Sequence, residues 1–237
     1  PYEMIDMVTT PDGSLVAMVH CNNCTSDLNA WVNLFKEYQE LLGVPVDMDE
    51  LYGKLYNAAL AGDPDCGGLI SYNYISGEPV TGMVEGRPLF VRSAGDKFNL
   101  ANFMRAHLYG SVGVLKIGND ILFNEEKVKV DRITGHGGLF KTKGVGQRIL
   151  AAALTSPISV METAGEGGAW GIALLGSYMV NNPKDLPLAD FLEEQVFAGD
   201  AGVEIAPTAK EVAGFNAYIE RYKAALPIEA AAAQYKK

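Results

Sequence analysis

The sequence predicts an α/β fold in which a mixed sheet is flanked by helices, built as one domain over residues 1–237. Short segments rich in β-branched and aromatic residues alternate along the chain with segments whose apolar residues recur at helical spacing. Two glycine turns, at 135–138 and 166–168, each stand between an expected strand and an expected helix. No internal repeat or low-complexity linker divides the chain, and its 237 residues are enough to bury one large core.

The composition excludes several classes of protein. The net charge of -10 and the pI near 4.8 argue against a nucleic-acid-binding surface, which requires a basic face. No apolar run approaches the roughly 18–20 residues of a membrane helix, and no basic, apolar secretory leader opens the chain. We therefore expect a cytoplasmic protein without a membrane or nucleic-acid partner. Because the chain starts at Pro1 and not at a methionine, we also expect a fragment or a cut domain.

The first half of the chain contains candidate strands and three candidate helices. A turn signal at 10–13 is followed by an apolar run, which predicts one hairpin of a larger sheet. Residues 25–27 can cap the first helix, and Asn99 can cap the third. The expected elements are, in order, a strand at Leu15–His20, helices at 28–42 and 48–60, a strand at 67–72 and a helix from Asn99 to about Leu115.

The central stretch, 131–178, has the pattern of strand, glycine turn, helix, strand, glycine turn and helix. We expect a strand at Val128–Thr134, a helix from Val145 that Pro157 ends, and a short strand at Ile158–Met161. A glycine turn between a strand and a helix leaves backbone N–H groups available at a helix start, where an anion or a nucleotide can bind. Two further amphipathic helices are expected at 188–197 and 208–226, the second ending before an alanine-rich tail.

Three cysteines do not form a disulfide framework. Cys21 and Cys24 stand as C-x-x-C directly after an apolar run, a spacing compatible with a redox pair or with half of a zinc site. No second C-x-x-C or H-x-x-x-H accompanies them, and Cys66 stands alone. Reduced thiols are therefore the default expectation.

Four segments, in sequence order, resemble the C-terminal domain of the FGGY carbohydrate kinases, a family of the superfamily that includes actin. Residues 68–79 are similar to the family's G-L-x-F-x-P-Y-x-x-G-E-R-x-P segment, and residues 98–110 resemble the H-x-x-x-x-x-x-R-A-x-x-E-G helix. Residues 135–160 resemble the glycine-rich segment that ends in P-V, and residues 162–175 resemble the E-x-x-A-x-G-A-A-x-x-A helix. Glycine pairs are common in proteins, so no single segment is decisive. The resemblance depends on all four segments matching in the right order.

The chain also departs from the family pattern at four places. No arginine follows Glu78, and Tyr109 stands where the family has a glutamate. Ala153 falls where an aspartate is usual, and Trp170 is bulkier than the usual alanine. These departures indicate a divergent branch and leave the substrate open.

The resemblance implies an actin-like ATPase (ribonuclease H-like) domain. It further implies that residues 1–237 are the C-terminal nucleotide-binding domain of a two-domain sugar kinase, lacking the N-terminal sugar-binding domain. ATP and Mg²⁺ would be the cofactors, and the ketopentoses xylulose and ribulose are the first candidate substrates. The family's catalytic base is an aspartate of the N-terminal domain, so we assign neither a catalytic residue nor a metal ligand to this chain.

The resemblance also implies a nucleotide site around the first glycine turn. The two central glycines would permit close approach of ATP, the phenylalanine would flank the base, and the threonine would hydrogen-bond the adenosine. The second turn would begin a helix of small residues under the pocket. The expected nucleotide-binding residues are Gly135, His136, Gly137, Gly138, Phe140, Lys141, Thr142, Gly167 and Gly168.

Each of these residues also has a structural explanation, and other functions remain open. The turn could simply join a strand to a helix, the lysine could be a surface residue, and the small residues could serve helix packing. A non-catalytic nucleotide- or sugar-responsive module is the main alternative. A dinucleotide-binding oxidoreductase is less favoured, because 135–138 lacks G-x-G-x-x-G spacing. The expected partners are ATP, a sugar and the N-terminal domain of the same kinase, and a homodimer is compatible with the sequence.

Overall fold

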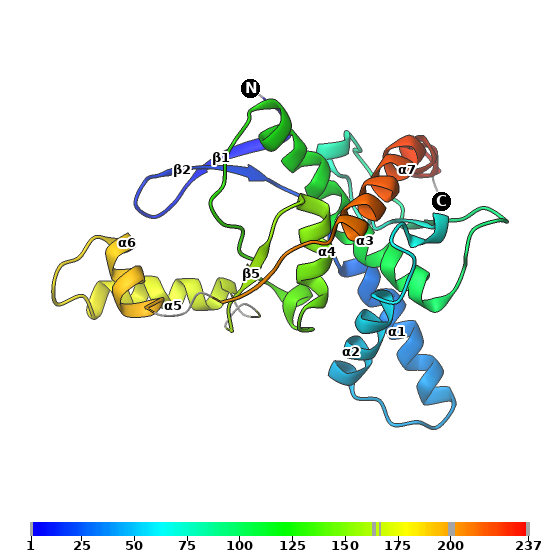
Figure 1. Ribbon diagram of the computed structural model, residues 1–237, viewed down its shortest axis with the longest axis horizontal. Coiled ribbons are helices and arrows are strands. Elements are labelled where there is room, and N and C mark those ends of the chain that lie inside the picture. Colours follow the sequence, from blue (N-terminus) through cyan, green and yellow to red (C-terminus); the bar gives the residue numbers. More distant parts are fainter. Residues whose placement is uncertain (1, 163–164, 166, 199–201, 236–237) are drawn as a thin grey trace.

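The computed structural model describes residues 2–162, 165, 167–198 and 202–235. Helices and short strands alternate along the chain, which confirms the α/β class (Figure 1). The helices are α1 (Ser26–Leu41), α2 (Met48–Ala59), α3 (Leu100–Asp120), α4 (Val145–Leu154), α5 (Gly167–Val180), α6 (Leu188–Phe191) and α7 (Ala209–Ala233). The strands are β1 (Ile5–Thr9), β2 (Leu15–Val19), β3 (Ile70–Tyr72), β4 (Leu89–Val91), β5 (Ile158–Val160) and β6 (Val203–Ile205).

Helix α3 lies at the centre of the molecule, in contact with α2, α4, α7 and β3. Its residues from Asn102 to Val114 are all buried, so the helix is covered on every side. Glycines make the close packing possible, because a methyl group at Gly110 would lie 2.6 Å from the carbonyl oxygen of Ser71 in β3. The expected cap is confirmed, since the Asn99 side chain accepts a hydrogen bond from the backbone N–H of Asn102 at 2.9 Å.

The strands form three separate two-stranded antiparallel ladders among the described residues. These ladders are β1–β2, β3–β4 and β5–β6. A parallel bridge joins Thr134 to Ser159 of β5, so the pairing is mixed even though no long sheet forms in the described part of the chain. The hairpin that contains Leu15–His20 is confirmed, with β1 as its first strand, but the larger sheet expected around it is wrong among the described residues, because β1–β2 is a separate two-stranded ladder.

The expected strand at Val128–Thr134 is wrong except at its last residue. Residues 124–132 are exposed, and only Thr134 pairs with a strand. Val128 and Val130 keep 45% and 47% of their surface exposed, so the alternation of valines and charges does not bury a face of a sheet. This segment is a connection that runs over the surface to the glycine turn.

The last helix contributes to the core and is longer than the sequence indicated. Helix α7 includes the alanine-rich tail and continues past Pro227 to Ala233. Its side chains Phe215, Tyr218, Ile219 and Tyr222 are buried against α3 and β3. The other expected helix, 188–197, is divided into α6 and a π-helical turn at Leu192–Val196.

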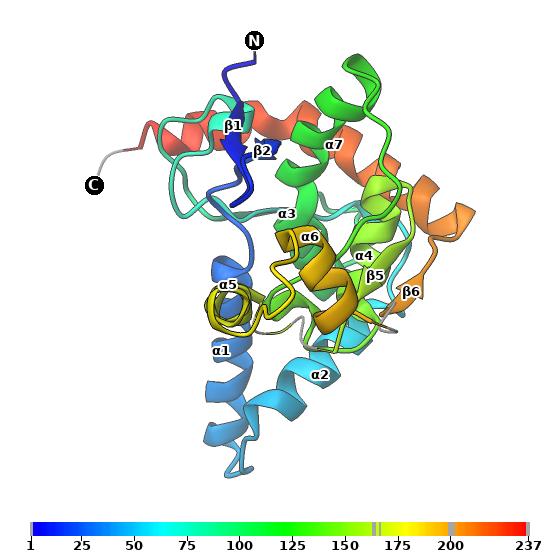
Figure 2. The ribbon, with the colours of Figure 1, turned by 90° about the vertical axis from the view of Figure 1, so that its left-hand side faces the viewer.

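Helices α5 and α6 project from one side of the molecule, the same side as the β1–β2 hairpin (Figures 1 and 2). Aromatic pairs hold this unit together, with Trp170 against Phe197 at 5.6 Å and Tyr178 against Phe191 at 5.3 Å between ring centroids. Within the described residues, no helix is both long enough and apolar enough to span a membrane.

Candidate nucleotide site

The first glycine turn joins the β5 edge to helix α4. The backbone N–H of Gly135 donates to the carbonyl of Ser159 at 2.8 Å, which fixes the start of the turn to β5. Gly137 then adopts φ 107° and ψ 178°, a conformation that L-residues rarely adopt. A single 3₁₀ turn, Gly138–Phe140, follows, with the N–H of Phe140 donating to the carbonyl of Gly137 at 3.1 Å. The glycine at 137 is therefore required by the backbone itself.

Two further glycines let the turn pack closely on its surroundings. A methyl group at Gly135 would lie 2.5 Å from the Phe140 ring, so this ring lies directly over the glycine. A methyl group at Gly146 of α4 would lie 2.6 Å from the carbonyl oxygen of Leu139, whose side chain is buried. Gly138 differs from both, because open space surrounds the position of its missing side chain. An approaching ligand can therefore reach the backbone at Gly138.

Three cavities meet around this turn. A cavity of about 490 Å³ lies on the side of the β1–β2 hairpin, one of about 550 Å³ lies on the side of α1 and α2, and another of about 550 Å³ lies on the side of β5 and β6. Volumes of this size are typical of small-molecule sites. The predicted residues that line at least one of them are Gly135, His136, Gly137, Gly138, Phe140, Lys141 and Thr142.

The hairpin-side cavity, hereafter the hairpin cavity, has polar edges and an apolar floor. The turn residues 134–140 form one wall, and the end of β2 together with the loop to α1 forms another. Val112 and Leu115 of α3 and Leu150 of α4 form the floor. Apart from the turn, the hairpin cavity is lined by Met18, Val19, His20, Cys21, Cys24, Thr25, Ser111, Val112, Leu115 and Leu150.

The second cavity, hereafter the α1–α2 cavity, is entered between the turn and the start of α1. Thr25, which precedes α1, lines both this cavity and the hairpin cavity. Its side chain makes no capping hydrogen bond, contrary to the expected cap at 25–27. On the far wall the Tyr52 hydroxyl donates to the Asn29 side chain at 3.0 Å, beside the buried Tyr56. An aromatic wall that faces a glycine turn is suited to a flat, polar-edged ligand such as a nucleobase.

Gly167 and Gly168, at the start of α5, do not line any of these three cavities in the described structure. A methyl group at Gly167 would lie 3.1 Å from Nδ1 of His136, so α5 begins against the rim of the turn. Gly168 is exposed, with open space around it. Glu166, which the sequence places at the start of this second turn, lies outside the described residues.

The C-x-x-C pair lies at the edge of the hairpin cavity. All three cysteines are free, and burial raises the pKa of the Cys21 thiol to about 12 and that of Cys24 above its usual range. Thiols with raised pKa values are mostly protonated near neutral pH and are weak nucleophiles and weak metal ligands. The described residues also contain no group of three His, Cys, Asp or Glu side chains that could hold a metal ion.

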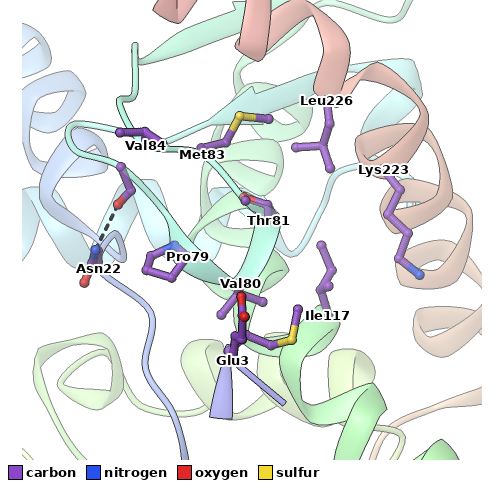
Figure 3. Close-up of a pocket in the computed structure, with 13 residues that line it drawn as sticks. Glu3, Asn22, Pro79, Val80, Thr81, Met83, Val84, Ile117, Lys223 and Leu226 are labelled. Carbon is purple, nitrogen blue, oxygen red and sulfur yellow. Dashed lines mark hydrogen bonds between the residues drawn. The ribbon is translucent and has the colours of Figure 1, made fainter. Parts of the chain in front are cut away.

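A buried carboxylate fixes the loop that carries this pair. Glu78 is fully buried, and its Oε2 accepts hydrogen bonds from the backbone N–H groups of Asn22 and Asn23 at 3.0 and 3.2 Å. The Asn22 side chain also donates to the carbonyl of Gly77 at 2.9 Å, as Figure 3 shows. Glu78 is the central residue of Gly77–Pro79, hereafter the G-E-P segment, for which the sequence alone indicated no definite role. In the structure it holds the β2–α1 loop in place at the edge of the site.

A further cavity of about 770 Å³ lies beyond this loop, on the far side of the G-E-P segment (Figure 3). Its walls come from residues 79–84, the end of α3, and α7, and Val80, Ile117 and Leu226 supply much of its apolar surface. The predicted site residues do not line it. Lys223 on its rim is ion-paired to Glu220 at 3.2 Å. The cavity lining also includes the polar side chains of Glu3, Asn22 and Thr81.

Two buried residues have structural roles that the sequence did not indicate. Gln147 of α4 is buried, and its side-chain amide donates to the carbonyls of Ile158 at 3.1 Å and Val203 at 2.7 Å, which fixes β5 and β6 to α4. Tyr109, which replaces the family's glutamate, accepts a hydrogen bond from Arg105 Nε at 3.2 Å and donates to the carbonyl of Pro64 at 3.0 Å. The tyrosine hydroxyl therefore provides an alternative partner for the buried arginine.

Solved structures with a similar fold include xylulose kinases and a gluconate kinase. A ligand-bound xylulose kinase from Lactobacillus acidophilus superposes with a TM-score of 0.68 at 17% identity, covering 96% of this chain and 43% of that one. The xylulose kinase from Rhodospirillum rubrum gives 0.66 at 18% identity, with the same two coverages. A gluconate kinase from Lactobacillus acidophilus gives 0.57 at 21% identity, covering 75% and 35%. At these identities the likeness concerns the fold, and the chain spans about two fifths of the length of the xylulose kinases.

The fold is that of an α/β domain of the actin-like ATPase type. The model of the FGGY family of carbohydrate kinases, C-terminal domain, matches residues 2–180. The chain therefore belongs to this family, and the expected resemblance is confirmed. Kinases of this family use ATP to phosphorylate carbohydrates. A comparison with curated protein sequences gave no match.

Proposed function

We propose that this chain forms the ATP-binding part of a carbohydrate kinase and that ATP binds around the turn at 135–142. The observation that carries the proposal is the open position at Gly138, which lines both the hairpin cavity and the α1–α2 cavity. A ligand that extends through both cavities passes the exposed backbone of this glycine. An elongated molecule with a base at one end and phosphates at the other has this shape.

The residues present fit such a ligand. Gly137 and Gly138 let it approach the backbone, Thr142 offers a hydroxyl at the edge of the α1–α2 cavity, and Tyr52 and Tyr56 supply an aromatic wall. The start of α1 beside Thr25 presents backbone N–H groups there, and its first turn also carries the carboxylate of Asp27. Phe140 lies over Gly135 but still lines the hairpin cavity. Phosphoryl transfer depends on positioning and on charge stabilisation, which such a surface can supply for the nucleotide.

Mg²⁺ would arrive with the nucleotide. The described residues contain no group of three candidate ligands, so this part of the chain does not build a metal site of its own. Mg²⁺ commonly keeps several waters and is held by substrate phosphates with only one or two carboxylates. We therefore propose that the ion neutralises the phosphates of ATP and that few protein groups touch it.

The sugar that we propose is a ketopentose, xylulose or ribulose. Several of the similar solved structures are xylulose kinases, whereas others are a gluconate kinase and a glycerol kinase, so the fold alone does not select the sugar. We propose further that residues 1–237 are the C-terminal nucleotide-binding domain and that an N-terminal domain supplies the sugar site and the aspartate base. A non-catalytic nucleotide- or sugar-responsive module is the alternative. Turnover of xylulose or ribulose on adding the N-terminal domain favours the kinase, and binding without turnover favours the module.

The binding site itself is tested by calorimetry with ATP on the wild type and on Gly138→Val. Because the space around Gly138 is open, valine should fit the folded protein but block the approach of the ligand, and we expect affinity to fall at least about tenfold, or about 1.4 kcal/mol. Gly95→Val is the matched control, since Gly95 is equally open and does not line any of the three cavities around the turn. Unchanged affinity in a folded Gly138→Val protein would show that ATP binds elsewhere.

A further inference from the structure

A cavity of about 330 Å³ lies between helix α1 and strand β4, and the residues predicted for the nucleotide site do not line it. Its volume is at the lower end of the range for small-molecule sites. Asn29 of α1 lines the α1–α2 cavity instead, so the two cavities lie on different faces of this helix. This cavity, hereafter the α1–β4 cavity, is lined by Asp27, Ala30, Trp31, Leu34, Pro88, Leu89 and Phe90.

The carboxylate of Asp27 faces this cavity without a positively charged partner. Asp27 exposes 8% of its surface, and its ion-pair partner among the described residues is Nδ1 of His107 at 3.9 Å. Burial lowers the pKa of that imidazole to about 3, so His107 is neutral near pH 7. Asp27 lies in the first turn of α1, where the helix dipole favours a negative charge. Because buried charges are normally paired, the cavity presents one half of an ion pair.

Two aromatic side chains, Trp31 and Phe90, also line the α1–β4 cavity. Both rings pack on the buried His107 ring, at centroid distances of 5.3 and 5.5 Å. Both also pack on Phe103, at 5.1 and 5.0 Å. These contacts fix the two rings in the absence of a ligand, which lowers the entropy cost of binding. Aromatic faces attract cations, and quaternary ammonium groups in particular.

The rest of the lining indicates which kind of cation fits. Apart from Asp27, every described side chain that lines the α1–β4 cavity is apolar or aromatic. A primary ammonium or a guanidinium group has several N–H donors, and most of them would lack an acceptor among these side chains, which costs free energy. A quaternary ammonium group has no N–H donor. Its charge is balanced by one carboxylate, and its methyl groups are suited to apolar and aromatic contacts.

We propose that the α1–β4 cavity binds a small quaternary ammonium compound, with Asp27 as its counter-ion and Trp31 and Phe90 as its aromatic contacts. Burial raises the pKa of the Asp27 carboxyl, and a cation held beside it would offset this unfavourable burial of charge. The net charge of -10 also favours the approach of a cation to the protein. The site is separate from the cavities around the glycine turn and does not depend on ATP binding there.

The first test compares choline with 3,3-dimethylbutan-1-ol, which has the same shape but carries a carbon atom in place of the charged nitrogen. In calorimetry on the full chain at constant ionic strength, choline should bind at a single site. Its affinity should be at least about tenfold higher than that of the alcohol, or about 1.4 kcal/mol. Equal affinities would show an apolar cavity that does not select charge. Either that result or no binding of choline at about 10 mM would overturn the proposal.

The second test locates the bound choline. Asp27→Asn keeps the shape of the side chain and removes its charge, so affinity should fall at least about tenfold. Phe90→Leu removes one ring and should lower affinity at least about threefold. Asp49→Asn is the matched control, because Asp49 also lies in the first turn of its helix but lines the α1–α2 cavity, beside Tyr52 and Tyr56. Unchanged affinity in folded Asp27→Asn or Phe90→Leu, or weaker binding by Asp49→Asn, would overturn the proposal.

The third test uses Trp31 as a reporter and needs no change in the lining of the cavity. The chain has two tryptophans, so Trp170→Phe leaves Trp31 as the single one. Its fluorescence emission should change on adding choline, with the same midpoint concentration as the heat of binding. The alcohol should produce this change only at concentrations at least about tenfold higher. Heat of choline binding without any change in Trp31 emission would place the ligand elsewhere and overturn the proposal.

Discussion

Acid should destabilise this domain through one buried histidine. His107 of α3 exposes 2% of its surface, and its ring packs against Phe103 and Phe90 at centroid distances of 4.4 and 5.5 Å. Nδ1 lies 2.9 Å from the Ser71 hydroxyl, and Nε2 is buried without a hydrogen-bond partner. Burial lowers the pKa of this imidazole from 6.5 to about 3. The folded protein therefore holds His107 in its neutral form.

The sign of the effect follows from the direction of this shift. The unfolded chain binds the proton near its pKa of 6.5, whereas the folded chain resists it until about 3. The free energy of unfolding is therefore highest above pH 6.5 and falls as pH decreases from there toward 3. At pH 5 the linkage amounts to a loss of about 2 kcal/mol relative to pH 8. For a chain of this size that corresponds to a melting temperature lower by about 4–8 °C.

The assay compares thermal melting at pH 8 and pH 5 for the wild type, His107→Gln and His20→Gln. Glutamine at 107 cannot bind the proton, so this variant should lose most of the extra pH dependence even if it is less stable at both values. His20→Gln should behave like the wild type, because the His20 side chain is 62% exposed. Burial also raises the pKa of the neighbouring Asp27, whose Oδ2 lies 3.9 Å from Nδ1 of His107. Asp27 is present in all three proteins, so its contribution to the pH dependence is common to them. An equal pH shift in the wild type and in His107→Gln would refute the reasoning.

Two further substitutions test the construction of the site. In urea titrations, Gly137→Ala should lower the free energy of unfolding by about 1–2 kcal/mol, because the φ of 107° at this position disfavours a side chain. Gly138→Ala should leave the free energy of unfolding unchanged, because open space surrounds that position. Equal losses in the two variants would mean that the backbone at Gly137 does not require glycine. Gln147→Leu should cost about 1–3 kcal/mol, because it leaves carbonyls of the β5 and β6 ladder without their donor. As a control, Gln234→Leu at an exposed position should leave the urea midpoint unchanged. A midpoint for Gln147→Leu within error of the wild type would show that the Gln147 amide does not stabilise the β5–β6 ladder.

The features that local chemistry determines could be predicted from the sequence. The cap at Asn99 needs only its own side chain and an N–H three residues later, and both are present. Helices α1, α2, α4 and α5 also follow the expected spacing closely. The turn at 135–138 was predicted because glycine marks backbone conformations that other residues avoid, and Gly137 has such a conformation.

The failures arise where distant contacts decide the local structure. The segment 128–134 has strand-like valines, but only Thr134 finds a pairing partner, in β5. The alanine-rich tail was expected to follow the last helix, yet it continues that helix, and within it the buried Glu229 accepts a hydrogen bond from the backbone N–H of Arg87 at 2.6 Å. Both contacts join residues that are far apart in the sequence, so neither can be inferred from the residues adjacent to them.

The same division applies to the candidate site. Residues 135–142 are contiguous, so a motif can find them together. Thr25, Asn29 and Tyr52 face them from α1 and α2, more than eighty residues earlier, and only the fold brings them to the α1–α2 cavity. The expectation for Gly167 and Gly168 was made from the motif, and the structure places them at the start of α5, outside the three cavities.

Helix α7 bears on where this domain ends as a folding unit. The family match stops at residue 180, but Phe215, Tyr218, Ile219 and Tyr222 lie beyond it and are 0–2% exposed in the core. Burying four such side chains contributes about 6–12 kcal/mol, which is as large as the whole stability of a typical domain. A protein cut at the end of the match would expose the faces of α3 and β3 that α7 covers. The family match therefore ends some fifty residues before the end of α7, although α7 supplies part of the core on which the matched residues pack.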